Sequence, residues 1–170
     1  MSAADWQSYR EGRRDVCDGR TADRIEQVSV IDIFQSSEAP ELFAEYAAEC
    51  SIPLIGEIHP QPAIYEAMEN TGMLKCFGVF SDEKLVGFAT VFTTILPHYD
   101  KKTATLESLF VKAKKRSGGL GQKLIEHIEQ SAKEAGCVAI LYSAPAGGKL
   151  ERLLSRKKYV CTNTVYCRSL

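Results

Sequence analysis

Three apolar runs joined by short polar turns occupy residues 73 to 111 and constrain the fold more than any other part of the chain. The runs are MLKCFGVF, LVGFATVFTTIL and TATLESLFV, and the segments between them are SDEK and PHYDKK. Aromatic and β-branched residues favour strands, and a turn of a few polar residues joins neighbouring antiparallel strands. The segment therefore predicts a three-stranded antiparallel meander.

Segments on either side of the meander add helices and further strands. Before it, residues 27–34 alternate as a strand, residues 39–50 carry apolar side chains at helical spacing, and residues 63–72 form a short helix. After it, we expect a helix at 120–135 with one apolar face, a strand at 137–144 buried on both faces, a short helix at 148–157, and one or two strands within 159–170. This order predicts a mixed, mainly antiparallel central sheet flanked by helices, in the α/β (α+β) class.

Length and charge limit the domain count and the classes of partner. A chain of 170 residues with 45% hydrophobic content suits one core, so we expect a single domain at 25–170 preceded by a charged, irregular N-terminal extension at 1–24. Lys and Arg number 21 against 22 Asp and Glu, a net charge of -1. No general basic field exists, so nucleic acid is not an expected partner and any anion site must be local.

Cysteine and histidine spacing gives no sign of a metal or a disulfide framework. The six cysteines form no CxxC pair and lie among apolar neighbours, so we expect reduced and mostly buried thiols. His59, His98 and His127 form no zinc motif, and no metal is expected. Apolar runs are too short to span a bilayer and the polar start lacks the apolar core of a signal peptide, so we expect a cytoplasmic protein with no membrane partner.

The stretch Arg116-Ser-Gly-Gly119-Leu-Gly121 stands at the start of the predicted helix 120–135 and has the features of an anion site. A helix start presents unpaired N–H groups and partial positive charge, and glycines allow an oxygen to approach them. Lys114, Lys115 and Arg116 add cationic charge beside the turn. Neither GxxxxGK[ST] nor a GxGxxG fingerprint is present. The turn therefore predicts a site for a phosphate or a pyrophosphate.

The same stretch has the spacing (Q/R)xxGx(G/A), preceded by a strand ending in Leu109-Phe-Val111 and followed by a helix. In this motif, and in its element order from about residue 25 onward, the chain resembles the GCN5-related N-acetyltransferases, the GNAT family. The resemblance implies that acetyl-coenzyme A (acetyl-CoA) is the cosubstrate. It also implies that the pantetheine arm lies along the strand before the turn and that the pyrophosphate lies on the turn itself. The cofactor-binding residues would then be Leu109, Phe110, Val111, Arg116, Ser117, Gly118, Gly119, Leu120, Gly121 and Gln122.

The resemblance further implies direct attack of an amine on the thioester, with a base to remove the proton of the amine. Glu107 lies where several members of the family carry a catalytic glutamate, and its alternative role is an outward-facing strand residue. Strict alternation would place it with Leu109 and Val111, whereas family members carry a bulge in this strand, so both directions stay open. We expect the acceptor to enter at the turn PHYDKK, which makes His98 a second catalytic candidate and Tyr99 a substrate contact. The further candidates Glu57, His59 and Tyr65 lie near the acceptor-specificity segment of the family.

The chain also departs from the family pattern. Aligning the usual LYEKLGF run on LLSRKKY places Leu154 where many members have a Tyr that protonates the leaving thiolate, and Gly147 where they have an Asn. Ser155 and Tyr142 are the nearby alternatives for that acid. The implied function is an acetyl-CoA-dependent N-acetyltransferase acting on an amine-bearing small molecule or peptide.

Two other functions remain open at this stage, as does the oligomeric state. One is a non-catalytic acyl-CoA-binding regulatory module with the same fold, which the missing Tyr favours. The other is nucleic-acid binding through the basic segment KAKKR, but the nearly neutral overall charge argues against it. The extension 1–24 could pair two copies into a homodimer or could cover the acceptor cleft.

Overall fold

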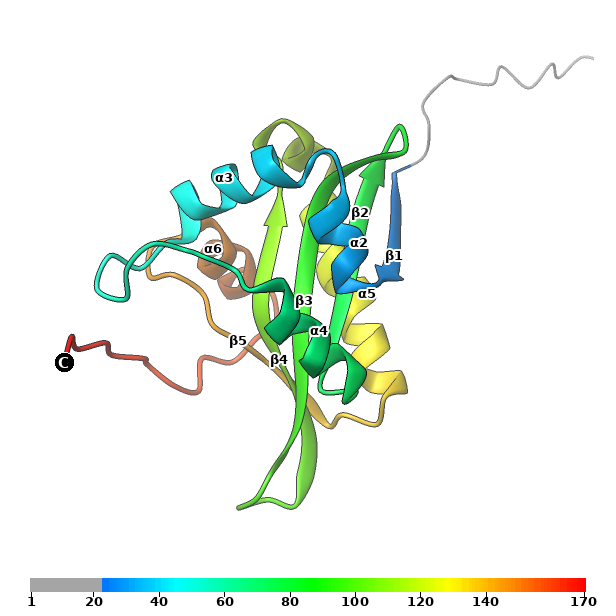
Figure 1. Cartoon of the computed structure of the whole chain (residues 1–170). Helices are drawn as coiled ribbons and strands as arrows, with labels where there is room; N and C mark the ends of the chain where they lie inside the picture. The colour runs from blue at the N-terminus through cyan, green and yellow to red at the C-terminus, as the bar shows by residue number, and fades with distance from the viewer. Residues whose placement is uncertain (1–22) are drawn as a thin grey trace, which may run out of the picture.

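The computed structural model describes residues 23–170, which form a five-stranded sheet and its covering helices. The strands lie in chain order, β1-β2-β3-β4-β5 (Figure 1). Their bounds are Arg24–Val28, Leu74–Ser81, Lys84–Leu96, Lys101–Val111 and Ala139–Tyr142. All neighbouring pairs are antiparallel except β4 and β5, which are parallel. The expected mixed, mainly antiparallel sheet is confirmed.

The predicted meander is the centre of this sheet. Ser81 pairs with Lys84 across the β2–β3 turn, and the two turn residues Asp82 and Glu83 both have positive φ, 53° and 60°. Two central residues with positive φ define the turn type whose twist matches that of a tight hairpin. The polar SDEK segment therefore closes β2 against β3 as predicted, and β3 pairs with β4 over most of its length.

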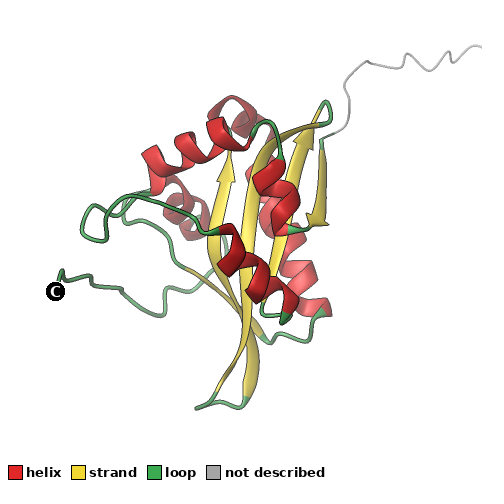
Figure 2. Ribbon diagram, in the orientation of Figure 1, coloured by secondary structure: helices red, strands yellow, loops and turns green. Residues whose placement is uncertain are grey.

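Helices cover both faces of the sheet (Figure 2). Helices α2 (Val30–Gln35), α3 (Ala39–Cys50) and α4 (Pro62–Asn70) lie on one face, over a core cluster that includes Leu42, Phe88 and Phe110. The 3-10 turn η1 (Ala113–Gly118) leads into α5 (Leu120–Glu134), and α6 is Lys149–Ser155. Helix α5 packs on the other face through its apolar stripe of Leu120, Leu124, Ile128 and Ala132.

Three sequence expectations need correction. The segment expected as one strand at 27–34 divides, because Ser29 caps a helix: its hydroxyl accepts from the Ile31 N–H, and Val30 and Ile33 then face the core. Strand β5 has four residues and is only half-buried, not buried on both faces. Residues 159–170, expected as strands, have no regular secondary structure and form an exposed arm (Figure 1).

The thiols are free but less buried than expected. Within residues 23–170, Cys50, Cys76, Cys137, Cys161 and Cys167 form no disulfide. Only Cys76 is buried among these five, and Cys161 and Cys167 lie exposed in the C-terminal arm. The sequence suggested burial because each cysteine has apolar neighbours, but those of the arm do not enter the core. Cys17 and most of the expected N-terminal extension lie outside the described residues.

Candidate active site

Glu107 is the extra residue of a β-bulge in β4. Thr90 of β3 pairs with Ser108, the next residue Val91 pairs with Leu106, and the register shifts between them. A bulge places two residues of one strand opposite one residue of its partner and so breaks the alternation of side chains. Glu107 and Ser108 consequently both face α4, whereas alternation alone would have turned Glu107 toward α5.

The Glu107 carboxylate is held by two hydroxyl groups. The Tyr65 hydroxyl of α4 donates to Oε1 at 3.2 Å, and the Thr90 hydroxyl donates to Oε2 at 2.5 Å. The Ser108 Oγ lies 2.5 Å from the same Thr90 oxygen, and because Thr90 has a single proton, Ser108 is the donor of that second bond. Thr90 and Ser108 are buried, while Glu107 itself is exposed. The two hydrogen bonds thus fix the orientation of the carboxylate, while the carboxylate stays accessible to solvent.

A cavity of about 250 Å³ contains this carboxylate. Its walls come from α2, α3, the loop at 58–60, α4 and the two central strands. Burial and the Glu107 charge raise the pKa of Tyr65 to about 12, and burial also raises the pKa of Tyr46 above its ordinary value. Both tyrosines therefore carry their protons at neutral pH and can act only as donors toward an anion.

Beyond Glu107, β4 has an open edge. Its pairing with β5 ends at Leu106 and Tyr142, so residues 107–111 have no strand partner on that side. The Lys112 N–H donates to the Val86 carbonyl of β3 at 2.8 Å. Because backbone groups of an antiparallel strand alternate in direction, Leu109 and Val111 turn their N–H groups away from β3 and toward the open edge. An extended chain can bind to this row of backbone groups.

The open edge leads to the uncapped start of α5. Gly119 has φ of 75° and is the N-cap of α5, and no side chain accepts from the first N–H groups of the helix. A Cβ added at Gly118, Gly119 or Gly121 would meet no atom within 4 Å, so the surface beside these glycines is open, while the Gly119 N–H itself donates to the Arg116 carbonyl at 3.4 Å. A bare helix start with open space before it suits an anion such as a pyrophosphate.

The cations beside the turn differ in their partners. The Arg116 guanidinium binds Glu49 of α3 through two bonds of 3.0 Å, and its Nε donates to the Val111 carbonyl at 2.6 Å. It also lies 5.0 Å over the Phe110 ring. Lys112 pairs with Glu41, and Lys115 donates to the Ser81 hydroxyl. Arg116 and Lys112 are thus paired with carboxylates, whereas among the described residues Lys115 meets only a neutral hydroxyl and keeps its positive charge beside the turn.

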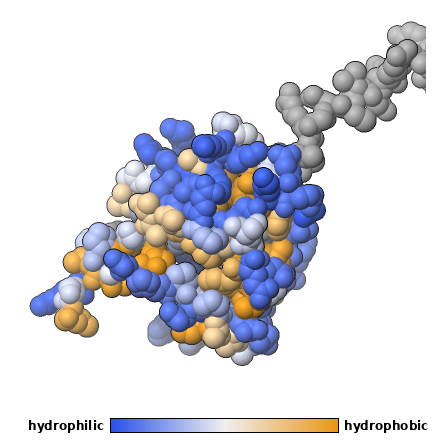
Figure 3. Space-filling view, turned by 45° about the horizontal axis from the view of Figure 1, so that its top comes forward, coloured by the Kyte–Doolittle hydropathy of each residue, from blue (hydrophilic) through white to orange (hydrophobic). Residues whose placement is uncertain are grey.

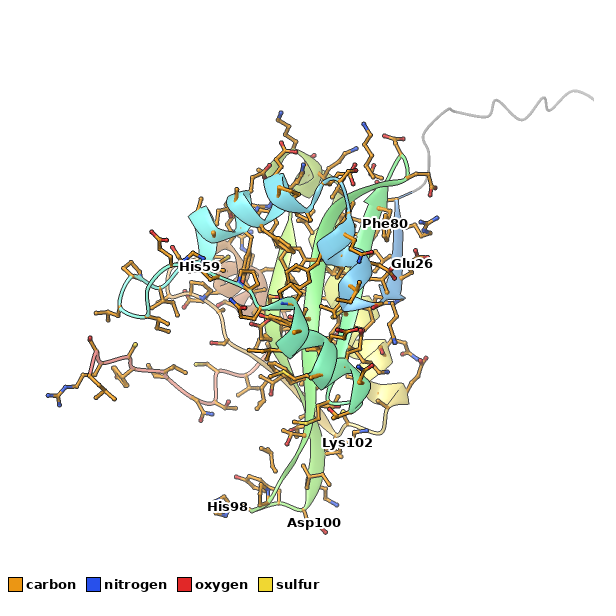
Figure 4. All side chains as sticks on the ribbon, in the orientation of Figure 1. Glu26, His59, Phe80, His98, Asp100 and Lys102 are labelled. Carbon is orange, nitrogen blue, oxygen red and sulfur yellow. The ribbon has the colours of Figure 1, made fainter. Side chains whose placement is uncertain are left out.

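The structure does not bring His98 to the cavity. His98 lies at the tip of the β3–β4 hairpin, which extends below the helices, and Tyr99 beside it is 72% exposed (Figure 4). His59, in contrast, lines the cavity, and its Nε2 lies 3.2 Å from Oε2 of Glu57. The cavity opens among the helices and not at the hairpin, which separates His98 from Glu107.

The two sequence alternatives for a thiolate acid are engaged elsewhere. The Ser155 hydroxyl donates to the Glu151 carbonyl at 2.8 Å, and the Tyr142 hydroxyl donates to Glu129 of α5 at 2.9 Å. The Tyr46 hydroxyl, which the sequence did not single out, makes no hydrogen bond with any residue in the described range. Tyr46 extends from α3 into the cavity and its ring packs against Phe88 and Phe110.

Residues 23–170 contain no group of three His, Cys, Asp or Glu side chains arranged to hold a metal ion. Within the same range, every helix is too short or too polar to cross a bilayer.

One known family model matches the part of the chain that contains most of the cavity lining and the glycine turn. Residues 37–149 match the model of the Acetyltransferase (GNAT) family, and this span covers more than half of the chain. The chain belongs to the GNAT acetyltransferase family. The GNAT match runs from the start of α3 to the start of α6 and so includes Glu107, the open edge of β4 and the glycine turn.

Solved structures share this GNAT fold at low sequence identity. The ribosomal-protein-alanine N-acetyltransferase of Brucella melitensis biovar Abortus 2308 superimposes with a TM-score of 0.68 at 19% identity, covering 88% of this chain and 99% of that chain. The aminoglycoside acetyltransferase meta-AAC0020 from an uncultured soil metagenomic sample, in complex with sisomicin, gives 0.65 at 18% identity, with 86% and 96% covered. A GNAT family acetyltransferase of Staphylococcus aureus subsp. aureus USA300_TCH1516 gives 0.63 at 12% identity, with 88% and 99% covered. A search of curated proteins found no match.

Proposed function

We propose that this protein transfers an acetyl group from acetyl-CoA to an amine by direct attack. The observation that carries the proposal is the continuity of three features along one strand. The Glu107 carboxylate, the unpaired edge at Leu109 and Val111, and the uncapped start of α5 follow one another from β4 into the next helix. Glu107 would lie beside the acetyl group and the acceptor amine, the strand edge would lie along the pantetheine arm, and the helix start would bind the pyrophosphate.

The glycine turn would bind the pyrophosphate. The N–H groups of Leu120, Gly121 and Gln122 open the first turn of α5, and the glycines at 118, 119 and 121 put no side chain in front of them. Arg116 and Ser117 precede these amides. Arg116 would act by holding the turn against Glu49 and the Val111 carbonyl rather than by facing the phosphates.

The strand edge would orient the thioester. An N–H group of Leu109 or Val111 that faces the gap toward β5 can donate to the thioester oxygen, and Phe110 anchors the strand in the core between them. Such donors stabilise the oxyanion that forms as the amine attacks, and elsewhere their removal costs about 3 to 4 kcal/mol of transition-state stabilisation. Bound acetyl-CoA supplies the activated acyl group.

Glu107 would act as the base. An amine is protonated at neutral pH, so its proton must leave before or during attack. The carboxylate accepts bonds from Tyr65 and Thr90, and neither of these neutral hydroxyl groups is basic enough to take the proton of the amine. The proton of the amine would therefore pass to Glu107, directly or through one water molecule. No role follows for His98 at the hairpin tip.

Thiol release separates this proposal from a non-catalytic acyl-CoA-binding module. Both functions require calorimetric binding of acetyl-CoA at the glycine turn, but only the enzyme produces free coenzyme A faster in the presence of an amine. A panel of amines assayed for thiol release, with amine-free reactions as the baseline, tests this difference. Binding without amine-dependent release from any member of the panel would favour the non-catalytic module.

A further inference from the structure

The cavity above Glu107 is unusually poor in charge for a site that would bind an amine. Its walls are mainly aliphatic and aromatic: Ile33 and Phe34 come from α2, Phe43 from α3 and Ile58 from the loop, while the hydroxyl groups of Tyr46, Tyr65, Thr90 and Ser108 supply most of its polar atoms besides Glu107. Phe88 closes the side nearest the sheet. On this side of the molecule, hydrophobic surface is bordered by hydrophilic atoms (Figure 3).

Among the described residues, only one carboxylate lines the cavity. That carboxylate is Glu107, and the His59 imidazole of the lining lies 3.2 Å from Glu57 on the exposed rim. Taking a charged group out of water is unfavourable unless a partner compensates it. The cavity can therefore compensate one ammonium group, next to Glu107, and its lining contains no second carboxylate.

The volume of the cavity limits the rest of the acceptor. An apolar cavity of about 150 Å³ holds one benzene molecule, so about 250 Å³ accommodates an aromatic ring with a short aliphatic arm. The wall already contains aromatic rings in contact, with Phe34 centred 5.1 Å from Phe43 and 6.0 Å from Tyr65. A further ring can join such a cluster in a tilted or edge-to-face arrangement.

Resting on the acetyl-transfer function proposed above, we propose that the acceptor is a small primary monoamine with an aromatic body, of the size of 2-phenylethylamine. Its ammonium group binds beside Glu107 and Tyr65, and its ring lies among Phe34, Phe43 and Phe88. Polyamines are disfavoured because a second ammonium group would lie against aliphatic and aromatic side chains away from Glu107. Amino sugars are disfavoured because their hydroxyl groups outnumber the polar groups of the lining that are not already bonded to one another.

Equilibrium binding to the full-length protein saturated with coenzyme A tests this preference without requiring turnover. We expect 2-phenylethylamine to bind at least tenfold more tightly in calorimetry than ethylamine, which lacks the ring, and than putrescine or glucosamine. Equal or tighter binding of putrescine or glucosamine, or no binding of any amine, would overturn the proposal. So would much tighter binding of a short peptide with an N-terminal phenylalanine, which would make the acceptor a polypeptide.

A pair of loop variants tests whether the cavity wall causes the preference. Ile58→Asp adds a second carboxylate at the wall, whereas Ile55→Asp adds the same charge on the same loop at a residue that is 74% exposed and does not line the cavity. We expect Ile58→Asp to lower the affinity ratio of 2-phenylethylamine to putrescine at least tenfold and Ile55→Asp to leave it unchanged. Equal ratios in the two variants would refute a role for the wall.

The two proposals fail in different ways. Tight binding of 2-phenylethylamine without thiol release would refute acetyl transfer and support the cavity preference. Thiol release with putrescine or glucosamine, but not with 2-phenylethylamine, would support acetyl transfer and refute the preference.

Discussion

The Thr90 hydroxyl lies 2.5 Å from the Glu107 carboxylate and joins the bulge of β4 to the centre of β3. This bond fixes the orientation of a carboxylate that would otherwise be a flexible surface group. A positioned base commonly contributes a factor of about 10² to 10⁴ to the rate. The bond therefore makes Glu107 the first residue to test.

Glu107→Gln should lower kcat for amine acetylation by at least about 10²-fold. The Michaelis constant for acetyl-CoA should change little, because the side chain lies in the cavity and not along the edge of β4. Steady-state thiol release measures both, and Glu66→Gln on the exposed surface of α4 is the matched control. The deficit should narrow at alkaline pH, where the free amine no longer needs a base. Unchanged turnover at every pH would show that Glu107 is not the base.

Thr90→Val should impair the reaction by displacing Glu107. Valine has nearly the shape of threonine but leaves both Glu107 and the buried Ser108 hydroxyl without their shared partner, at a cost of about 1 to 3 kcal/mol in unfolding free energy. We expect a fall in kcat smaller than that of Glu107→Gln. Thr90→Ser, which keeps the hydroxyl, should restore most of the rate. If the serine variant were as slow as the valine variant, the hydroxyl alone would not account for the loss of rate.

Gly121→Glu should abolish acetyl-CoA binding without unfolding the protein. The position has open space around it, and a carboxylate in the first turn of a helix interacts favourably with the helix dipole. The same carboxylate repels the pyrophosphate and occupies its place. Gln130→Glu, about 14 Å further along the same helix, serves as the charge control. Calorimetry with acetyl-CoA and a thermal melt provide the two readouts, and equally tight binding by Gly121→Glu and by the control would contradict the role of the turn.

How far the sequence determined this arrangement varies from element to element. The meander and α5 were predictable because each has a single clear period, and the apolar stripe from Leu120 to Ala132 is buried as expected. The prediction of one strand at 27–34 was wrong. The sequence VSVIDIF fits both the alternation of a strand and the spacing that buries Val30 and Ile33 on a helix. The arm after residue 158 has strand-like composition, but composition does not supply a partner strand.

The candidate site also contains residues that the sequence identified and residues that it did not. The glycine turn is local, so its residues were identified from the sequence alone. The direction of Glu107 depends on a bulge, which is a mismatch between two strands and has no signature in either one. Thr90 and Tyr46 were missed because a hydroxyl within an apolar run and a tyrosine at helical spacing both look like core residues. His98 was selected for its turn, whereas the cavity is formed by helices that approach from elsewhere in the chain.

Glu49 should stabilise the protein only above the acidic range of pH. The Arg116 guanidinium bonded to Glu49 lowers the pKa of that carboxyl. A depressed pKa in the folded state contributes stability that is present above the ordinary carboxyl pKa and is lost as the pH falls through the lowered value. Because the Glu49 side chain is 38% exposed, the contribution is about 1 kcal/mol or less. Urea unfolding of Glu49→Gln should thus show a deficit at neutral pH that disappears in strong acid, and a deficit independent of pH would exclude the ion pair as its cause.

Tyr46→Phe should slow the reaction while leaving the fold intact. Tyr46 lines the cavity, its hydroxyl has no hydrogen-bond partner in the described range, and burial raises its pKa, so the hydroxyl stays protonated and is free to donate a hydrogen bond to a leaving thiolate. Removing one hydroxyl without a partner costs little stability, and we expect kcat to fall about tenfold with an unchanged melting temperature. Tyr142→Phe is the matched control with the opposite pattern: it removes a donor to Glu129, so stability should fall while kcat is retained. Equal kcat for Tyr46→Phe and the unmodified protein would show that the thiolate leaves without this acid.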